Sequence, residues 1–346
     1  MRNRYLDLLR AAAVARVVLY HLTGWSALTI VFPAMSVMFA LGGSMMAASL
    51  DRSGPMAVER RLRRLLPSLW VLSAVAVPAM LIDGVFWNWK LLLWLFPIED
   101  PWAGGTWTAA LSATWYLRDF LWFVVLSPLL LPLFRRLPLV SVTTPYAALA
   151  VITLGGLTPH PIVRDLALYG GAWLLGFAHH DGKLRDRRLL WVAGVAAAIA
   201  AAWMVTHPGP RGFDLNDIPL ANALWSLAVV LVLLRISPAI RPNRLVTVLN
   251  ARALTIYLWH VPILVAITHA GEAAGWPVRG DLGIGWRAVV LAAMLALVVL
   301  AVGWVEDWAA GRRPELLPGR GVPIRPSLGP DPVPVARTER ELTAVR

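Results

Sequence analysis

The first apolar segment of the chain contains four side chains that could do chemistry. Residues 2–22, RNRYLDLLRAAAVARVVLYHL, carry Asp7, Arg10, Arg16 and His21 among aliphatic residues. In an α-helix, Arg10 and His21 lie about three turns plus roughly 20° apart, so they share one face at a separation of about 16 Å. Asp7 lies one turn before Arg10 on the same stripe, whereas Arg16 points elsewhere.

These residue types are suited to moving a proton and to holding an anion. Histidine, whose ordinary pKa is near 6.5, can take a proton from a hydroxyl. The planar fork of arginine matches phosphate and carboxylate groups. Charged groups within a membrane span are costly and commonly mark function. The alternatives are a pairing of Asp7 with Arg10 at the helix end and a packing role for His21. For Arg16, snorkelling or pairing with a neighbouring helix is favoured over chemistry.

Three further histidines are candidates for a function. His260 follows Arg252 on a later apolar segment, about 12 Å further along a helix, which matches the depth of His21. It could orient a substrate or relay a proton, and a core histidine bonded to a neighbouring helix is the alternative. His179 and His180 begin HHDGK, which is interpreted as a solvated turn rather than a metal pair. No metal site is predicted, and the absence of cysteine excludes disulfides, Cys-ligated zinc and a Cys nucleophile.

The composition places these residues in a membrane protein. Hydrophobic residues make up 58% of the chain, charged residues only 15%, and the mean hydropathy is +0.64. A soluble domain is nearer half apolar and a quarter charged. The net charge of +12 is explained by the basic residues of cytoplasmic loops. A nucleic-acid partner is therefore not expected.

About ten apolar segments predict an all-α polytopic membrane protein, because about 20 apolar residues cross a bilayer as a helix. They run near residues 8–27, 29–50, 66–84, 115–134, 143–158, 163–180, 189–206, 218–235, 247–268 and 286–308. The first is interpreted as a retained span rather than a signal peptide, because Arg16 and His21 interrupt it and no small-x-small cleavage site closes it. Residues 86–97, FWNWKLLLWLFP, are too short to cross and are expected at the membrane interface, where Trp is favoured.

The charge of the loops predicts the orientation of these spans. Basic residues alternate between rich and poor loops, which places both termini in the cytoplasm. The inside loops hold Arg52, Arg60, Arg61, Arg63, Arg64, Arg135, Arg136, Lys183, Arg185, Arg187, Arg188, Arg235, Arg241, Arg244, Arg252, Arg312 and Arg313. Residues 1–310 are predicted to form one integral-membrane domain. Residues 311–346, rich in proline and charge, are predicted to form a disordered cytoplasmic tail.

Four motifs, in order, resemble the integral-membrane acyltransferases of family 3, over residues 4–308. The first span carries an Arg, ten residues and a His, here R-AAAVARVVLY-H, after the lead-in YLDLLR. ERRLRRLLPSLW resembles the family's Arg-x-x-Arg loop at Arg61 and Arg64. WYLRDFL and IYLWHVPI resemble its Trp-centred middle segment and its late Tyr-Leu-x-His-x-Pro motif. The middle segment departs from the family's Trp-Ser-Leu-x-x-Glu, because Asp119 is its nearest acid. A hydrolase-like domain after the membrane part, as some members have, is not expected.

The resemblance implies a membrane-bound O-acyltransferase. Its donor would be a cytoplasmic acyl-CoA, most often acetyl-CoA, used as a co-substrate without a tightly bound cofactor. Its acceptor would be a hydroxyl of a carbohydrate, glycolipid or secreted metabolite, and its location the bacterial cytoplasmic membrane. His21 would be the general base. A single His without a nearby Ser or Cys favours direct transfer, and an acyl-histidine intermediate is the alternative. Arg10 would position the donor, with Arg61 and Arg64 at a basic mouth.

The remaining candidates are expected to contact the substrates. They are Asp7, Trp115, Tyr116, Asp119, Tyr257 and His260. Trp115 and Tyr116 could stack on sugar faces, with an interfacial belt as the alternative. Asp119 could receive a hydroxyl or orient His21, with an interfacial pairing to Arg118 as the alternative. The basic loop around Arg61 and Arg64 could also serve orientation and anionic lipid alone.

Two other functions would fit the intramembrane charge. A transporter or flippase for an anionic or glycosylated envelope precursor also needs a polar interior and a basic inner mouth. The absence of an internal repeat argues against it. An enzyme fold that serves only as a partner or scaffold is the other alternative. The retention of both Arg10 and His21 argues against that function.

Overall fold

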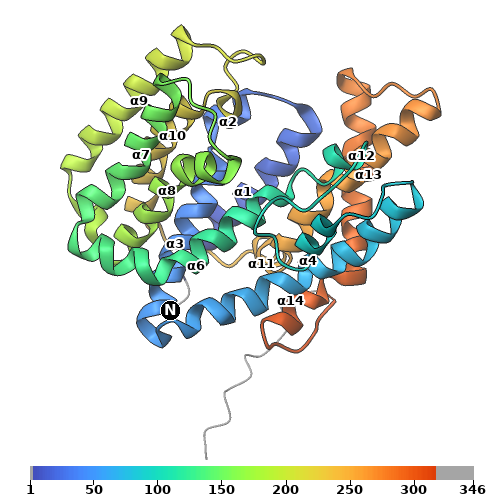
Figure 1. Ribbon diagram of the computed structural model, residues 1–346, viewed down its shortest axis with the longest axis horizontal. Helices are drawn as coiled ribbons and strands as arrows, with labels where there is room; N and C mark the ends of the chain where they lie inside the picture. The colour runs from blue at the N-terminus through green and yellow to red at the C-terminus, as the bar shows by residue number, and fades with distance from the viewer. Residues whose placement is uncertain (1–2, 317–346) are drawn as a thin grey trace, which may run out of the picture.

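A computed structural model describes residues 3–316, which form an all-helical bundle without strands in that range (Figure 1). Ten of its helices have 17 residues or more, and each overlaps one of the ten predicted segments. They are α1 (Arg4–Thr23), α3 (Ala34–Ser53), α4 (Met56–Ile82), α6 (Thr114–Arg136), α7 (Pro138–Leu154), α8 (Pro161–His180), α9 (Arg188–Thr206), α10 (Pro219–Arg235), α12 (Ala253–Ala273) and α13 (Gly280–Val302).

Shorter elements connect these helices. They are α2 (Ala27–Val31), η1 (Trp89–Trp94), α5 (Trp107–Ala110), η2 (Lys183–Arg185), η3 (Leu215–Asp217), α11 (Arg244–Ala251) and α14 (Trp304–Ala309). The predicted interfacial stretch 86–97 contains the 3-10 helix η1. Phe86, Trp87 and Trp89 are exposed there, whereas Trp94 is buried.

Within residues 3–316, six helices are long and apolar enough to cross a membrane, so the chain is an all-α membrane protein. They are Ala27–Ser53, Met56–Ile82, Thr114–Arg136, Arg188–Thr206, Ala253–Ala273 and Gly280–Val302. The apolar helices α7 and α10 are shorter, and α1 and α8 are not among the six. The count of ten spans and the cytoplasmic position of both termini stay predictions.

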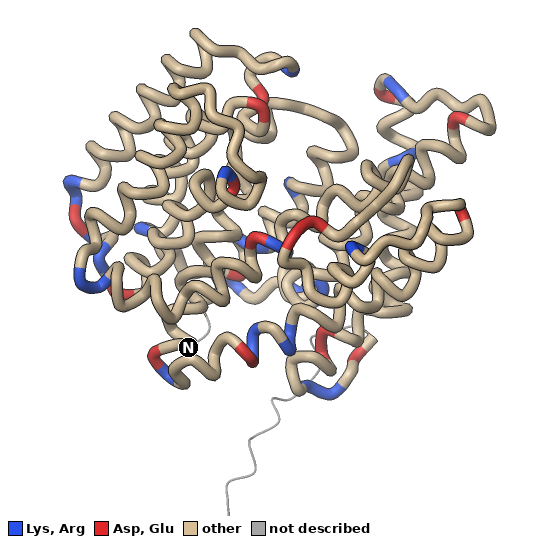
Figure 2. The backbone as a smooth tube through the Cα atoms, in the orientation of Figure 1, with Lys and Arg blue, Asp and Glu red and all other residues tan. Residues whose placement is uncertain are grey.

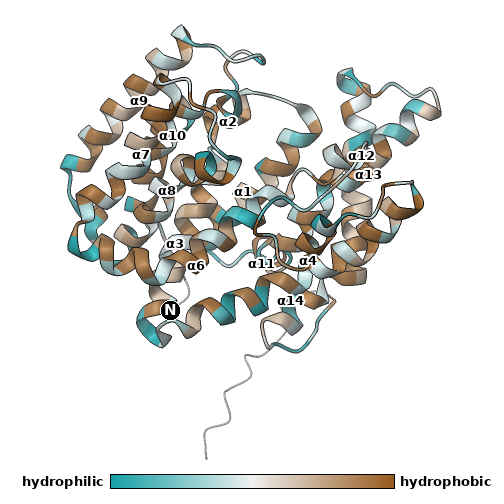
Figure 3. Ribbon diagram, in the orientation of Figure 1, coloured by the Kyte–Doolittle hydropathy of each residue, from teal (hydrophilic) through white to brown (hydrophobic). Residues whose placement is uncertain are grey.

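Helices α9 and α13 are mostly exposed, and their exposed surfaces are apolar. Trp191 on α9 is 80% exposed and Val289 on α13 is 71% exposed. Figure 3 shows apolar colour along both helices, which lie at opposite sides of the bundle. Large exposed apolar faces on a folded chain mark contact with a membrane or a partner. Lipid contact on both sides explains these surfaces.

Helix α1 lies at the centre of the bundle between α3 and α12 (Figure 1). Helix α3 in turn packs closely on α8 through glycines. A Cβ atom on Gly43 would lie 2.2 Å from the carbonyl oxygen of Trp173, and one on Gly176 would lie 2.1 Å from that of Ala40. Only glycine allows backbones to approach this closely. The rigid α3–α8 pair thus forms a wall behind α1.

Three of the predicted spans run across a local break between helices. The first was expected to run to residue 27, but α1 ends before Gly24, whose φ of 68° is left-handed. The segment 247–268 crosses the junction of α11 and α12 at Arg252, whose φ of −117° is not helical. The segment 286–308 likewise crosses the junction of α13 and α14 at Gly303.

The start of the predicted tail packs on this last junction. Buried Arg252 donates to Asp307 at 2.6 Å and also to the carbonyl oxygen of Glu315. Residues 311–316 are therefore held against the bundle rather than detached from it. The rest of the predicted tail, residues 317–346, lies outside the described residues.

Candidate active site

Two histidines from the two ends of the chain meet inside the bundle. His21 lies near the end of α1, and His260 lies in the middle of α12. Nδ1 of His21 and Nε2 of His260 are 3.1 Å apart, and the ring centroids are 4.9 Å apart. His260 is completely buried, whereas His21 is exposed to a cavity. The sequence placed the two at similar depth, and the structure brings them into contact.

The neighbours of the histidine pair determine where its protons lie. Nδ1 of His260 is 2.6 Å from the carbonyl oxygen of Tyr257, and Nδ1 of His21 is 3.0 Å from that of Val17. Because a carbonyl oxygen only accepts, we assign a proton to each Nδ1. Nε2 of neutral His260 then accepts from His21. This arrangement leaves Nε2 of His21 with its lone pair free, which is the form that a general base needs.

His21 faces a cavity of about 790 Å³, called the outer cavity here because it lies toward the side that the loop charges predict to be outside. Helices α1, α6, α8 and α12 and the loop between α4 and α6 form its wall. Among the predicted candidates, His21, Trp115 and Tyr257 line it. The rings of Trp115 and Tyr169 are stacked with centroids 5.5 Å apart. Aromatic and polar groups side by side suit a substrate with both apolar and hydroxyl-bearing surfaces.

The predicted basic residues converge on the other side of the histidine pair. Arg10, Arg61 and Arg64 line a small cavity of about 80 Å³ together with Tyr116 and Glu306. Arg61 and Arg64 also line an adjoining pocket of about 530 Å³, with Arg52 and Arg60. Figure 2 shows Lys and Arg along α4, on the side of the bundle where the N-terminus lies. Arg60 belongs to this basic pocket too, although the resemblance singled out only Arg61 and Arg64.

Tyr257 connects the two sides, because it lines both the outer cavity and the small inner one. Its ring centroid lies 5.0 Å from that of Tyr116 and 5.6 Å from that of His260. A continuous row therefore runs from the basic pocket, past the two tyrosines, to His21. This row places the predicted arginines, tyrosines and histidines along one path. The sequence alone could not show that arrangement.

Two residues near Arg10, Asn250 and Glu306, were not predicted from the sequence. Nη2 of Arg10 donates to the carbonyl oxygen of Asn250 at 3.2 Å, and Asn250 donates to the carbonyl oxygen of Asp7 at 2.6 Å. The Asp7 side chain lines neither cavity. Glu306 does line the inner one, where it accepts from the backbone and hydroxyl of Thr255. No motif drew attention to Glu306, which was read as part of the last span.

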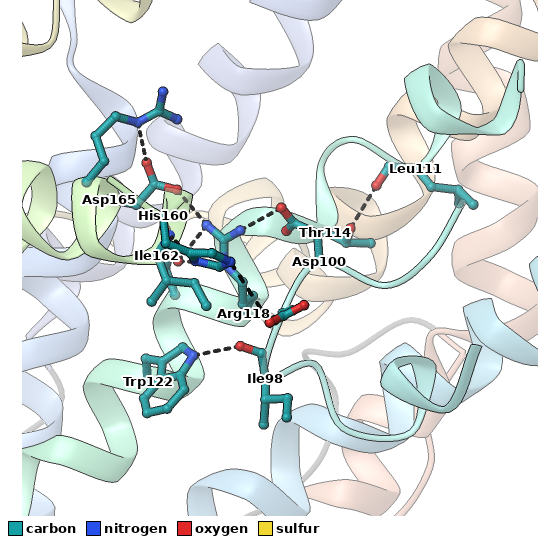
Figure 4. Close-up of polar contacts among 12 residues, drawn as sticks. Ile98, Asp100, Leu111, Thr114, Arg118, Trp122, His160, Ile162 and Asp165 are labelled. Carbon is teal, nitrogen blue, oxygen red and sulfur yellow. Dashed lines mark hydrogen bonds and ion pairs between the residues drawn. The ribbon is translucent and has the colours of Figure 1, made fainter. Parts of the chain in front are cut away.

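Asp119 forms an ion pair with its neighbour, and none of its described contacts is with His21. Nε of Arg118 donates to Asp119 at 2.8 Å, and its two Nη atoms donate to Asp100 at 2.6 Å and Asp165 at 2.5 Å (Figure 4). Nδ1 of His21 contacts the carbonyl oxygen of Val17 and Nε2 of His260 instead. The pairing alternative for Asp119 is thus the one that its contacts favour.

This Arg118 cluster fixes the outer loop between α4 and α6. Asp100 belongs to that loop, and the next anchor is Trp122, which donates to the carbonyl oxygen of Ile98 at 2.9 Å (Figure 4). Burial raises the pKa of Asp100, and the nearby guanidinium of Arg118 opposes that rise. The loop supplies one wall of the outer cavity, so the cluster positions that wall.

A second polar cluster closes the cavity at the end of α1. Asp214, fully buried in the loop before α10, accepts from the hydroxyl of Tyr20 at 2.6 Å. Arg211 donates to the same hydroxyl at 2.5 Å and to both oxygens of Asp217. These hydrogen bonds hold the pKa of Asp217 below its usual range. No sequence motif pointed to Arg211.

His179 and His180 have separate partners. His179 lies 2.9 Å from the hydroxyl of Ser44, and His180 lies 2.8 Å from Asp51. Asp51, His180 and Asp181 offer ligand atoms within 4.8 Å of one another. The guanidinium of Arg135, however, donates to both carboxylates at 2.8 Å. It supplies the positive charge that a metal ion would otherwise provide.

An all-helical membrane protein with a histidine pair inside the bundle, a basic pocket on one side and a polar cavity on the other has the framework of a membrane-embedded enzyme. The chain matches the model of acyltransferase family 3, described as an acyltransferase domain, over residues 3–305. It therefore belongs to this family of acyltransferases. No curated protein and no solved structure shows a significant match to the chain. Family membership favours acyl transfer over the transport alternative.

Proposed function

We propose that the chain transfers an acyl group, most simply acetyl, from cytoplasmic acyl-CoA to a hydroxyl in the outer cavity. The acceptor would be a carbohydrate, glycolipid or secreted metabolite, and the setting the bacterial cytoplasmic membrane. The proposal rests on the row of residues that runs from the basic pocket, past Tyr116 and Tyr257, to His21. Arginines suit the phosphates of CoA. The narrow cavity beyond them suits its slender pantetheine arm.

In this reaction His21 acts as the general base and then as the acid. Its Nε2 takes the proton of the acceptor hydroxyl while the hydroxyl oxygen attacks the thioester carbonyl carbon. The C–S bond then breaks, and the proton passes from His21 to the departing thiolate. The products are an ester and free CoA, with no net gain or loss of protons. Arg10 holds the donor, and Tyr116 and Tyr257 flank the path of its arm.

Transfer of label from donor to acceptor tests this function directly. The purified protein would be placed in lipid nanodiscs with radiolabelled acetyl-CoA and an extract of bacterial envelope. We expect label in an extractable ester that mild alkali releases. Label that stays in CoA or free acetate, at the rate seen in empty nanodiscs, would contradict the proposal.

In this mechanism His260 is a positioning residue, because it acts through His21. His260→Phe removes one of the two acceptors for Nδ1 of His21 and leaves only the carbonyl oxygen of Val17 to orient the ring. We expect kcat to fall roughly 10- to 100-fold, less than the roughly 10⁴-fold loss measured when a charged orienting carboxylate is neutralised in a serine protease. KM for acetyl-CoA should not change.

The matched variant is His260→Gln, whose amide oxygen can still accept from His21. His260→Gln should retain more of the activity than His260→Phe, because Gln, like the neutral His260 that it replaces, can accept a hydrogen bond. Steady-state kinetics of label transfer separate kcat from KM. Equal losses in the two variants, or a loss confined to KM, would show that His260 only fills space.

A further inference from the structure

Arg16 is nine-tenths buried in the wall of the outer cavity, close to His21. The carbon of its guanidinium lies 5.1 Å from the centroid of the Tyr20 ring, and the His21 ring centroid lies 5.5 Å from the same point. Only 9% of Arg16 is exposed. Both residues line the outer cavity. A strongly buried cation thus faces the same space as the proposed base.

Among the described residues, the charge of Arg16 has no carboxylate within ion-pair distance. The other arginines of the cavity differ in this respect. Arg118 pairs with three carboxylates, Arg164 contacts Asp165 at 3.3 Å, and Arg211 is 2.6 Å from Asp217. Asp214 accepts from Tyr20 and lies 3.3 Å from Arg211. Burying an unpaired guanidinium costs several kcal/mol, and the contact with the Tyr20 ring offsets only part of this cost.

The hydrogen bonds of Arg16 leave one end of its fork free. Nε donates to the carbonyl oxygen of Leu28 at 2.9 Å, which fixes the plane of the guanidinium. Nη1 and Nη2 have no partner in the described part of the chain, and neither is sealed from solvent. Two parallel N–H donors held in place are the arrangement that binds a carboxylate or a phosphate in a bidentate manner.

We propose that Arg16 binds an anionic group, a carboxylate or a phosphate, on the acceptor. The inference rests on the proposed function and narrows its acceptor to an acidic molecule, such as a uronic acid or a phosphorylated sugar. Because the guanidinium of Arg16 and the ring of His21 both lie within 5.5 Å of the Tyr20 ring centroid, the anion and the acylated hydroxyl belong to the same end of the acceptor. Carboxylate and phosphate share the required chemistry, and the test distinguishes them.

Binding of simple anions tests the site without turnover. The full chain in detergent would be titrated with methyl glucuronide, glucose 6-phosphate and the neutral methyl glucoside, and its thermal unfolding followed. The two anions should raise the unfolding temperature of the wild type, and the neutral sugar should not. The anion with the larger shift identifies the group that the site prefers.

In Arg16→Gln the apparent affinity for the preferred anion should fall about tenfold or more, since hydrogen bonds to a charged partner are lost. The matched control is Arg287→Gln. Arg287 is a partly buried arginine on α13 that donates to the carbonyl oxygen of Gly283 and lies outside the cavity. It should keep the wild-type response. Equal responses of the wild type and Arg16→Gln, or equal responses to anions and the neutral sugar, would overturn the proposal.

The charge of the labelled product separates this inference from the proposed function. The ester formed from radiolabelled acetyl-CoA and envelope extract would be fractionated by anion exchange, and the mass of the labelled fragment determined. Retained label supports an acidic acceptor, and the mass tells a carboxylate from a phosphate. Label in an uncharged product overturns the role of Arg16 while acyl transfer stands. A complete lack of transfer contradicts the function, and the anion titration still decides whether the site exists.

Discussion

His21→Ala should lower kcat for acyl transfer by about 10²- to 10⁴-fold, the usual contribution of a general base. The variant removes the only ring nitrogen of the histidine pair that the assigned protonation leaves free in the outer cavity. Binding of CoA should be unaffected, because Arg10, Arg61 and Arg64 lie on the other side of Tyr257. Single-turnover transfer of label measures the rate, and a CoA binding isotherm measures the affinity.

His269→Ala provides the matched control for this substitution. His269 lies on α12 like His260, but it is exposed, and its Nδ1 lies 3.4 Å from a carboxylate oxygen of Glu272. It should retain the wild-type rate. Because His21 is exposed to the cavity, added imidazole should restore part of the acyl-transfer activity of His21→Ala. It should not raise the activity of the wild type, which already has the base. Wild-type kinetics in His21→Ala would show that the stripe on α1 is structural.

Arg118→Met should destabilise the protein by about 3–5 kcal/mol. This is the usual penalty for removing one partner from a buried ion pair, because a buried charge is left uncompensated. Asp119 is fully buried and Asp165 is nearly so, and both lose their guanidinium. The midpoint of thermal unfolding in detergent, followed as loss of the monomer peak, should fall clearly.

Two further variants locate the cause of this loss. Arg164→Met removes an exposed contact to the same Asp165 and should cost less than about 1 kcal/mol. Adding Asp119→Asn to Arg118→Met should recover part of the stability, because it removes one uncompensated charge. If Arg118→Met and Arg164→Met lower the unfolding temperature equally, the cluster does not stabilise the outer loop in the way described.

The sequence was sufficient to locate the helices but not their ends. Runs of apolar residues marked all ten long helices, because each must bury or expose an apolar surface of similar length. The breaks at Arg252 and Gly303 were invisible, since they depend on how α12 packs against α14. Gly303 admits the Arg252 side chain, which would lie 2.7 Å from a Cβ atom placed there. Such contacts arise only in the folded chain.

The candidate site was likewise only partly predictable from the sequence. Arg10 and His21 were found because they share one helix, whose periodicity is known. The contact between His21 and His260 depends on the packing of α1 against α12. The free fork of Arg16 depends on a carbonyl of α2. Helical spacing set Arg16 apart from the stripe of Arg10 and His21, but its long side chain reaches the same cavity. Spacing along one helix does not predict where a flexible side chain ends.

The pair of tyrosines between the two cavities has a consequence for the living cell. In the proposed reaction the donor reaches from one compartment and the acceptor waits in the other, so the protein contains a passage through an energised membrane. Any open passage would dissipate the proton gradient that the cell maintains. Tyr116 and Tyr257, both buried and with ring centroids 5.0 Å apart, must therefore act as an electrical seal. In the proposed reaction only the slender arm of the donor passes between them to His21, while the phosphates of CoA stay in the basic pocket.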